Sequence, residues 1–114
     1  MDQITAYKQA ARQVIEYIAS LIPPEDPIET QVIIDDERGH YLLFSVGWEP
    51  AIRREYSPFA HIDVKPDGKV WVQHDGTDLR IALMLADAGI PKHQIVLGYH
   101  APYRRSALPE FAQG

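Results

Sequence analysis

The chain has 114 residues, of which 46% are hydrophobic and 24% charged, and its formal net charge is -5. This size and composition predict a single folded domain over residues 1–114 and exclude a disordered chain. The acidic balance argues against a surface that grips nucleic-acid phosphates, and the lack of cysteine excludes disulfides, thiolate zinc sites and a cysteine nucleophile.

No apolar run approaches the roughly 20 residues that span a bilayer, and the first residues lack the basic-then-apolar order of a signal peptide. We therefore expect no membrane partner. Because a cysteine-free composition fits a reducing compartment, we expect a cytoplasmic protein.

Residues 4–21 have the hydrophobic period of an amphipathic helix. The apolar positions recur at alternating spacings of three and four residues: Ile4, Tyr7, Ala11, Val14, Ile18 and Leu21. Asp2 can cap the first turn, and Pro23-Pro24 ends the helix because proline has no N–H to donate. We expect the apolar stripe to cover one face of a small sheet.

Two antiparallel strands are predicted next, because the hydrophobic period changes to two. Residues 28–35 form the first strand, residues 36–39 supply a turn, and residues 40–48 form the second strand. On the second strand His40, Leu42, Phe44, Val46 and Trp48 share one face.

A further hairpin is predicted from residues 59–65 and 69–74, which flank Pro66-Asp67-Gly68. A two-residue loop would set His61 opposite His74 and mix polar with apolar side chains on one face. A three-residue loop pairs Lys65 with Lys69 and keeps the apolar residues together, so it is the preferred register. In that register His74 lies on the opposite side of the sheet from His61.

The remainder is predicted as a second helix over residues 78–88, a short strand at 95–97 and an irregular tail. Thr77 or Asp75 would cap this helix, and Gly89 would end it. The inward residues would be Leu79, Ala82, Leu83 and Ala86. The fold class is therefore α+β, with an N-terminal helix, a four-stranded mainly antiparallel sheet, a second helix, and a short C-terminal strand and tail.

The strongest group of catalytic residue types is His61-Ile62-Asp63, with His40 on a neighbouring strand and His74-Asp75 in the same hairpin. Such a group is compatible with a small metal-dependent hydrolase that uses His61 and Asp63. We favour a hydrogen-bonding role for His61 and Asp63, because 5 His and 16 acidic residues produce such pairs by chance. Asp75, just before a helix, is typical of a cap. We therefore assign no catalytic, cofactor-binding or metal-ligating residue.

Acidic residues are concentrated around the first strand. Glu25, Asp26, Glu29, Asp35, Asp36 and Glu37 lie in a segment without Lys or Arg. Two interpretations remain open: a solvated strand edge that resists aggregation, and a docking surface for a basic partner.

Aromatic and arginine side chains are mixed in the tail, as in His100-Ala101-Pro102-Tyr103-Arg104-Arg105. This mixture is typical of protein interfaces, and a tail that folds back on its own domain is the equal alternative. Direct DNA binding would require Arg53, Arg54, Arg104 and Arg105 to gather on one face.

Six short segments of the chain follow one another in a characteristic order and spacing. They are ERGHYLL at 37–43, VGW at 46–48, HIDVK at 61–65, KVWVQ at 69–73, DGT at 75–77 and IVLGYH at 95–100. Together they resemble the XisI family, the cyanobacterial fdxN element excision controlling factors. The chain departs from the family pattern at Tyr56-Ser57-Pro58-Phe59 and around Leu108-Pro109.

The resemblance implies a non-enzymatic regulator of developmentally controlled, site-specific DNA excision in heterocyst development. A separate recombinase would carry out the excision, and this factor would act with a companion XisH-like protein. The resemblance carries over no catalytic residue and no cofactor. We expect no direct nucleic-acid binding, and a homo-oligomer would bury apolar surface that a thin sheet leaves exposed.

Overall fold

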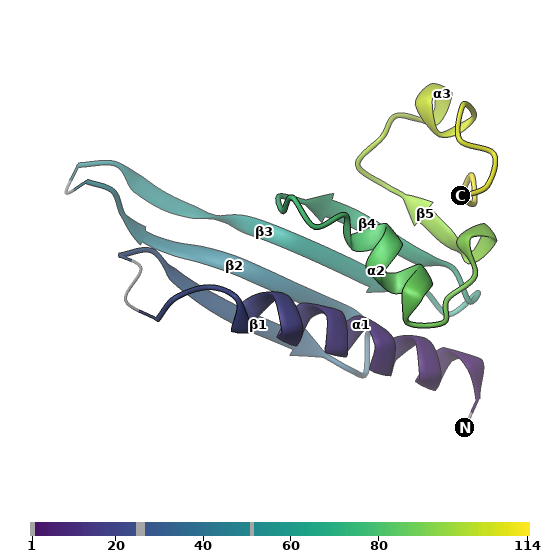
Figure 1. Cartoon of the computed structure of the whole chain (residues 1–114), viewed down its shortest axis with the longest axis horizontal. Helices are drawn as coiled ribbons and strands as arrows, with labels where there is room; N and C mark the ends of the chain where they lie inside the picture. The colour runs from purple at the N-terminus through teal and green to yellow at the C-terminus, as the bar shows by residue number, and fades with distance from the viewer. Residues whose placement is uncertain (1, 25–26, 51) are drawn as a thin grey trace.

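A computed structural model of the chain describes residues 2–24, 27–50 and 52–114. One sheet has the strand order β1-β2-β3-β4-β5 (Figure 1). Its strands are β1 (Glu29–Asp35), β2 (His40–Trp48), β3 (Arg54–Val64), β4 (Val70–Asp75) and β5 (Ile95–Leu97). The helices are α1 (Gln3–Ser20), α2 (Ile81–Asp87), the 3-10 turn η1 (Lys92–Gln94) and α3 (Pro102–Arg105). The α+β class is confirmed, and the short C-terminal strand joins the sheet as a fifth strand, parallel to β4.

Helix α1 begins at its predicted cap, because the Asp2 carboxylate accepts a hydrogen bond of 2.8 Å from the Thr5 N–H. Its buried residues are Tyr7, Ala10, Ala11, Val14, Ile15 and Ile18. The placement of Leu21 in the apolar stripe is wrong, since this residue is the C-cap and is 50% exposed. Ile15 and Ala10 are buried in addition, because a helix lying on a sheet buries a stripe wider than one residue per turn.

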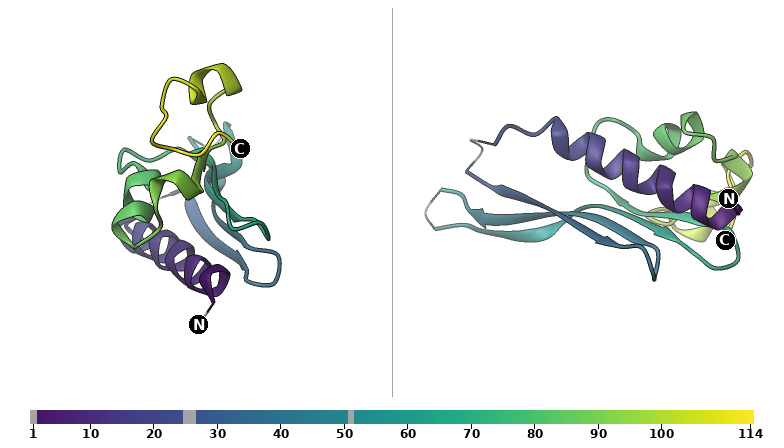
Figure 2. Two further views of the ribbon diagram at one scale, coloured as in Figure 1. Left: turned by 90° about the vertical axis from the view of Figure 1, so that its right-hand side faces the viewer. Right: turned by 90° about the horizontal axis from the view of Figure 1, so that it is seen from below.

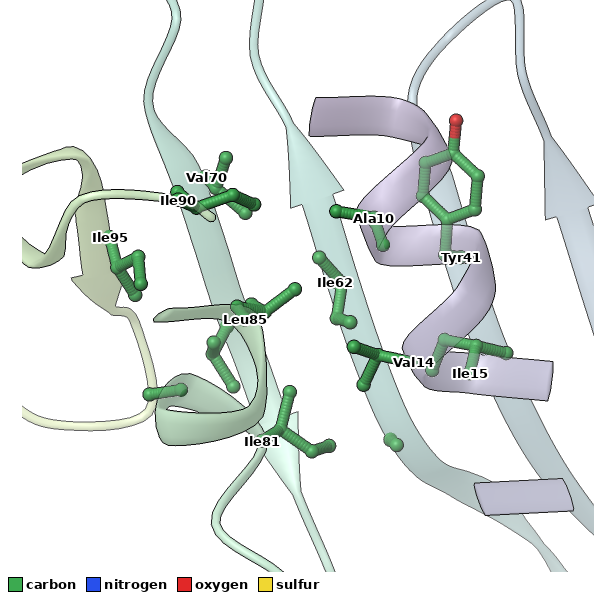
Figure 3. Close-up of a cluster of buried hydrophobic side chains, with 14 of the residues drawn as sticks. Ala10, Val14, Ile15, Tyr41, Ile62, Val70, Ile81, Leu85, Ile90 and Ile95 are labelled. Carbon is green, nitrogen blue, oxygen red and sulfur yellow. The ribbon is translucent and has the colours of Figure 1, made fainter. Parts of the chain in front are cut away.

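The hydrophobic core lies between the sheet and two helices. α1 and α2 cover the same face of the sheet, and the opposite face of β1, β2 and β3 carries no helix among the described residues (Figure 2). Ile62 lies beside Val14 of α1, with Leu85 of α2 on its other side, and the Tyr41 ring lies beside Ala10 of α1 (Figure 3). No helix in the described part of the chain is long and apolar enough to cross a membrane.

Strand β3 begins at Arg54, earlier than the predicted start at residue 59. Pro58 lies inside it, opposite Phe44, next to a register shift that leaves Phe59 as an extra residue. The proline is tolerated because β4 pairs only with residues 60–64 of β3, so no neighbouring strand on that side needs its missing N–H.

The second hairpin has the predicted three-residue loop. The Lys65 N–H donates to the Lys69 carbonyl at 2.9 Å, and Val64 pairs with Val70. A second register shift between His61 and Ile62 then sets His74 opposite His61. The expectation that these two histidines lie on opposite sides is therefore wrong, because a bulge in the second half of β4 undoes the register that the turn sets.

Helix α2 begins at Ile81, three residues later than predicted. The preceding residue Arg80 has a left-handed backbone with a φ of 58°, which stops the helix from extending toward Asp78. Leu79 is therefore 43% exposed and not inward, and the buried residues are Ile81, Ala82 and Leu85, with Leu83 and Ala86 half-buried. The helix ends as predicted at Gly89, whose N–H donates to the Ala86 carbonyl while Ile90 N–H reaches Leu85.

Candidate functional site

Three of the predicted site residues meet on the face of the sheet opposite α1. His40 of β2 pairs with Asp63 of β3, and its Nδ1 lies 3.2 Å from Nε2 of His61 and 3.7 Å from Oδ1 of Asp63. The two imidazoles are therefore within hydrogen-bond distance of each other, one as donor and one as acceptor. Burial, followed by the neighbouring His40, lowers the pKa of His61, so the neutral form of His61 is favoured.

Asp63 is the one buried charged side chain of the described residues, with 4% of its surface exposed. Its Oδ2 lies 2.8 Å from Nζ of Lys65 and accepts a 3.3 Å hydrogen bond from the Gln73 amide. The carboxylate is thus compensated by a cation just after the end of its own strand and by a donor on β4. This arrangement favours the hydrogen-bonding interpretation of Asp63.

The metal-ligand alternative finds little geometric support. Among the residues that the structure describes there is no group of three or more His, Cys, Asp or Glu side chains able to hold a metal ion. His74 pairs with His61 but is exposed, and the Asp75 carboxylate accepts hydrogen bonds from the N–H groups of Thr77 and Ile81.

The N-cap residue of α2 is Arg80, not Thr77 or Asp75 as predicted, but the Asp75 carboxylate still accepts the N–H of the first helical residue. Its Oδ1 accepts from the N–H and the hydroxyl of Thr77 at 2.9 and 2.6 Å, and its Oδ2 accepts from the Ile81 N–H at 2.9 Å. One carboxylate therefore ties the end of β4 to the first turn of the helix, which is a structural role.

The acidic residues around β1 are largely satisfied within the chain. Asp36 lies 2.6 Å from the Arg12 guanidinium and accepts a 2.8 Å hydrogen bond from the Tyr41 hydroxyl, while Asp35 pairs with Arg38 at 3.3 Å. Burial and the bond to Asp36 raise the pKa of Tyr41. Because β1 is an edge strand, Asp35 and Asp36 fit the interpretation of a solvated strand edge. Their ion pairs with Arg12 of α1 and Arg38 of the turn weaken the case for a basic partner. Glu25 and Asp26, the other members of this acidic group, lie outside the described residues.

The tail folds back on its own domain. The Arg105 guanidinium lies 5.3 Å from the Trp71 ring centre, and Arg105 and Gln113 exchange hydrogen bonds of 3.0 Å. Ala112 forms a parallel bridge with Val96 of β5. The tail therefore covers the outer side of β4 and β5 and leaves that of β1, β2 and β3 uncovered.

The arginines required for direct DNA binding do not gather. Arg54 lies near the tip of the long β2–β3 hairpin, whereas Arg104 and Arg105 lie on α3 at the opposite end of the molecule (Figure 1). The longest dimension of the molecule is 43 Å, so these groups do not form one basic patch.

The sequence analysis expected a thin sheet to leave apolar surface exposed but did not locate it; the structure shows it as the uncovered surface of β1, β2 and β3, which we call the open face. It consists of Ile33, Leu42, Phe44, Val46, Trp48, Arg54 and Tyr56, on the opposite side of the sheet from the buried Tyr41 and Leu43. Arg54 lies over the rings of Trp48 and Tyr56 at 5.5 and 5.3 Å, and Phe44 contacts Tyr56 edge-on. Its signal in the sequence was the run of apolar residues on both faces of β2.

Comparison with known proteins gives a consistent result. The sequence matches the family model described as XisI protein over residues 1–113. A crystal structure of a XisI-like protein from Anabaena variabilis is 35% identical, with a TM-score of 0.86, over 96% of this chain and 97% of that one. The fdxN element excision controlling factor XisI from the same organism is 32% identical, with a TM-score of 0.84, over 99% of this chain and 100% of that one. None of the curated proteins matches this chain.

Proposed function

The chain belongs to the XisI family, and on that premise we propose that it is a non-enzymatic regulatory factor that controls site-specific excision of a DNA element. A separate recombinase cuts and rejoins the DNA, and the chain acts in the cytoplasm by binding a companion XisH-like protein. The observation that carries the proposal is the end-to-end likeness to a protein named as an fdxN element excision controlling factor.

The charge distribution supports action through a protein contact. The net charge of -5 repels phosphates, and the arginines of the hairpin tip and of α3 lie at opposite ends of the molecule. A factor of this kind influences a recombinase more readily through another protein than by holding DNA itself.

The polar network supports a non-enzymatic role. A hydrolase that used His61 and Asp63 would need a carboxylate available to a metal or a water, whereas Asp63 is buried and paired with Lys65. Calorimetric titration with zinc, manganese and magnesium tests this point. We expect no binding heat, and a heat that disappears in His61→Ala would favour the hydrolase instead.

The experiment that tests the companion contact is co-purification with the XisH-like protein encoded nearest to this gene. We expect the two proteins to co-elute in gel filtration and to be recovered together in a pull-down. Charge attraction between the two proteins is strong at low salt and screened at high salt. If no complex forms at either salt concentration, the proposal is contradicted.

A further inference from the structure

Two histidines contact each other across β2 and β3, next to the open face. Nδ1 of His40 lies 3.2 Å from Nε2 of His61, and the ring centres are 5.3 Å apart with the ring planes tilted by 51°. A hydrogen bond between two imidazoles needs a proton on one nitrogen and a lone pair on the other. The contact therefore forms when both rings are neutral or when one is charged, and a charge on both rings removes the lone pair on which it depends.

Two carboxylates flank His40, one on each neighbouring strand. Asp35 of β1 lies opposite His40 in the ladder, and its carboxylate pairs with Arg38 of the turn at 3.3 Å. Oδ1 of Asp63 on β3 lies 3.7 Å from Nδ1 of His40, and Oδ2 lies 2.8 Å from Nζ of Lys65. Each carboxylate is thus matched by one cation, so these four groups add no net charge while both imidazoles are neutral.

The surroundings of His61 resist a positive charge on its ring. Burial and the neighbouring His40 lower the pKa of His61. The charge of Lys65 lowers it further, and the Asp63 carboxylate opposes these effects. His74 of β4 lies opposite His61 in the ladder, is exposed, and adds a further like charge in acid. The first proton therefore resides on His40, between the two carboxylates, and only the second proton enters the His61 ring.

We propose that His40 and His61 form an acid-sensitive switch, which is closed while at most one ring is charged and opens when both rings are charged. Two imidazolium rings repel each other at hydrogen-bond distance, so the side chain of His40, which is 39% exposed, turns toward solvent. The strands stay paired, because the Val64 N–H donates to the Gly39 carbonyl at 2.8 Å beside the switch. Opening therefore moves side chains and leaves the sheet intact.

Opening of the switch changes the charge of the surface beside the open face. The ion pairs of Asp35 and Asp63 cancel, so the charge of this surface follows the two imidazole rings. It is neutral when neither ring holds an added proton, and it is positive when both do. Acid therefore strengthens the attraction of this surface for an acidic surface, and a neutral pH removes that attraction.

A nuclear magnetic resonance titration of the histidine rings tests the coupling between the two residues. We expect the pair to take up its protons in two separate steps, and His40→Gln should raise the pH at which His61 titrates by about one unit above the second step of the wild type. His93→Gln, at an exposed residue of η1, is the matched control and should leave the titration of His61 unchanged. Equal titration of His61 in the two variants would overturn the proposal.

The opening itself is followed in the wild-type chain, which avoids any effect of a substitution on folding. Nuclear Overhauser effects between the two rings, whose centres are 5.3 Å apart, should persist through the first protonation step and disappear at the second. Those between the backbones of β2 and β3 should remain. Ring contacts that survive the second step, or that disappear together with the backbone contacts, would overturn the proposal. Both experiments use the chain alone, so their outcome is independent of the companion protein.

Discussion

Lys65 is predicted to stabilise the fold by compensating the buried carboxylate of Asp63. Lys65→Met keeps most of the aliphatic side chain and removes the ammonium group that lies 2.8 Å from Oδ2. Breaking a fully buried pair costs about 3–5 kcal/mol, and an exposed pair contributes about 0–1 kcal/mol. Because the Asp63 side chain is 6% exposed and that of Lys65 42%, we expect a loss between these limits, about 2 kcal/mol.

Urea denaturation at neutral pH measures this loss, and Lys69→Met is the matched control. Lys69 flanks the same turn, but its ammonium group reaches only the Gly114 carbonyl at 3.4 Å. We expect this control to change the free energy of unfolding by less than about 0.5 kcal/mol. Equal effects of the two substitutions would refute the reasoning, because the buried carboxylate would then not depend on its cation.

Three further changes test other parts of the structure. Gly39→Ala should lower the free energy of unfolding by about 2–4 kcal/mol, since the φ of Gly39 is 79° and the new methyl group would meet the Val64 carbonyl. Gly89→Ala, at a φ of 106° in open space, should lower it by only about 1–2 kcal/mol. Equal losses of the two variants in urea denaturation would contradict this. Asp75→Ala should cost about 1–2 kcal/mol and speed amide exchange at the first turn of α2, and unchanged exchange there would argue against the cap. Because the pKa of His61 is lowered in the folded chain, the unfolded chain binds the proton more readily. The free energy of unfolding of the wild type should therefore fall as the pH drops below about 6.5, and more steeply than that of His61→Phe. Parallel pH profiles of the two proteins in urea denaturation would contradict this.

Local patterns predicted much of the fold. The cap at Asp2, the end of α2 at Gly89 and the three-residue turn each depend on residues close in sequence, and the structure has all three. The turn register could be chosen because only one choice separates polar from apolar side chains.

The errors come from contacts that are distant in sequence or from backbone irregularities. The bulge that sets His74 opposite His61 has no signature in the hairpin residues. The early start of β3 was not predicted because Pro58 argues against a strand, and this proline is tolerated only because β4 does not pair with that part of β3. Helix α2 starts late because Arg80 adopts a left-handed conformation, which a helical period does not reveal.

The candidate site was predicted in part. The sequence placed His61 and Asp63 on one face with His40 on a neighbouring strand, and the strand pairing confirms that His40 lies beside them. The compensation of Asp63 by Lys65 and Gln73 and of Asp36 by Arg12 could not be read from spacing, since each depends on side-chain geometry between elements. The position of the open face was not predicted, because β2 is apolar on both faces and its pattern does not show which face the helices cover.

Reconstituted excision tests the central claim most directly. A plasmid that carries the DNA element is supplied with the recombinase and the XisH-like companion, with or without this chain. We predict that excised product forms only when the chain is present, and that His61→Ala, which removes the residue a hydrolase would need, excises as well as wild type. Equal excision with and without the chain would contradict the account, and so would loss of excision in a folded His61→Ala variant.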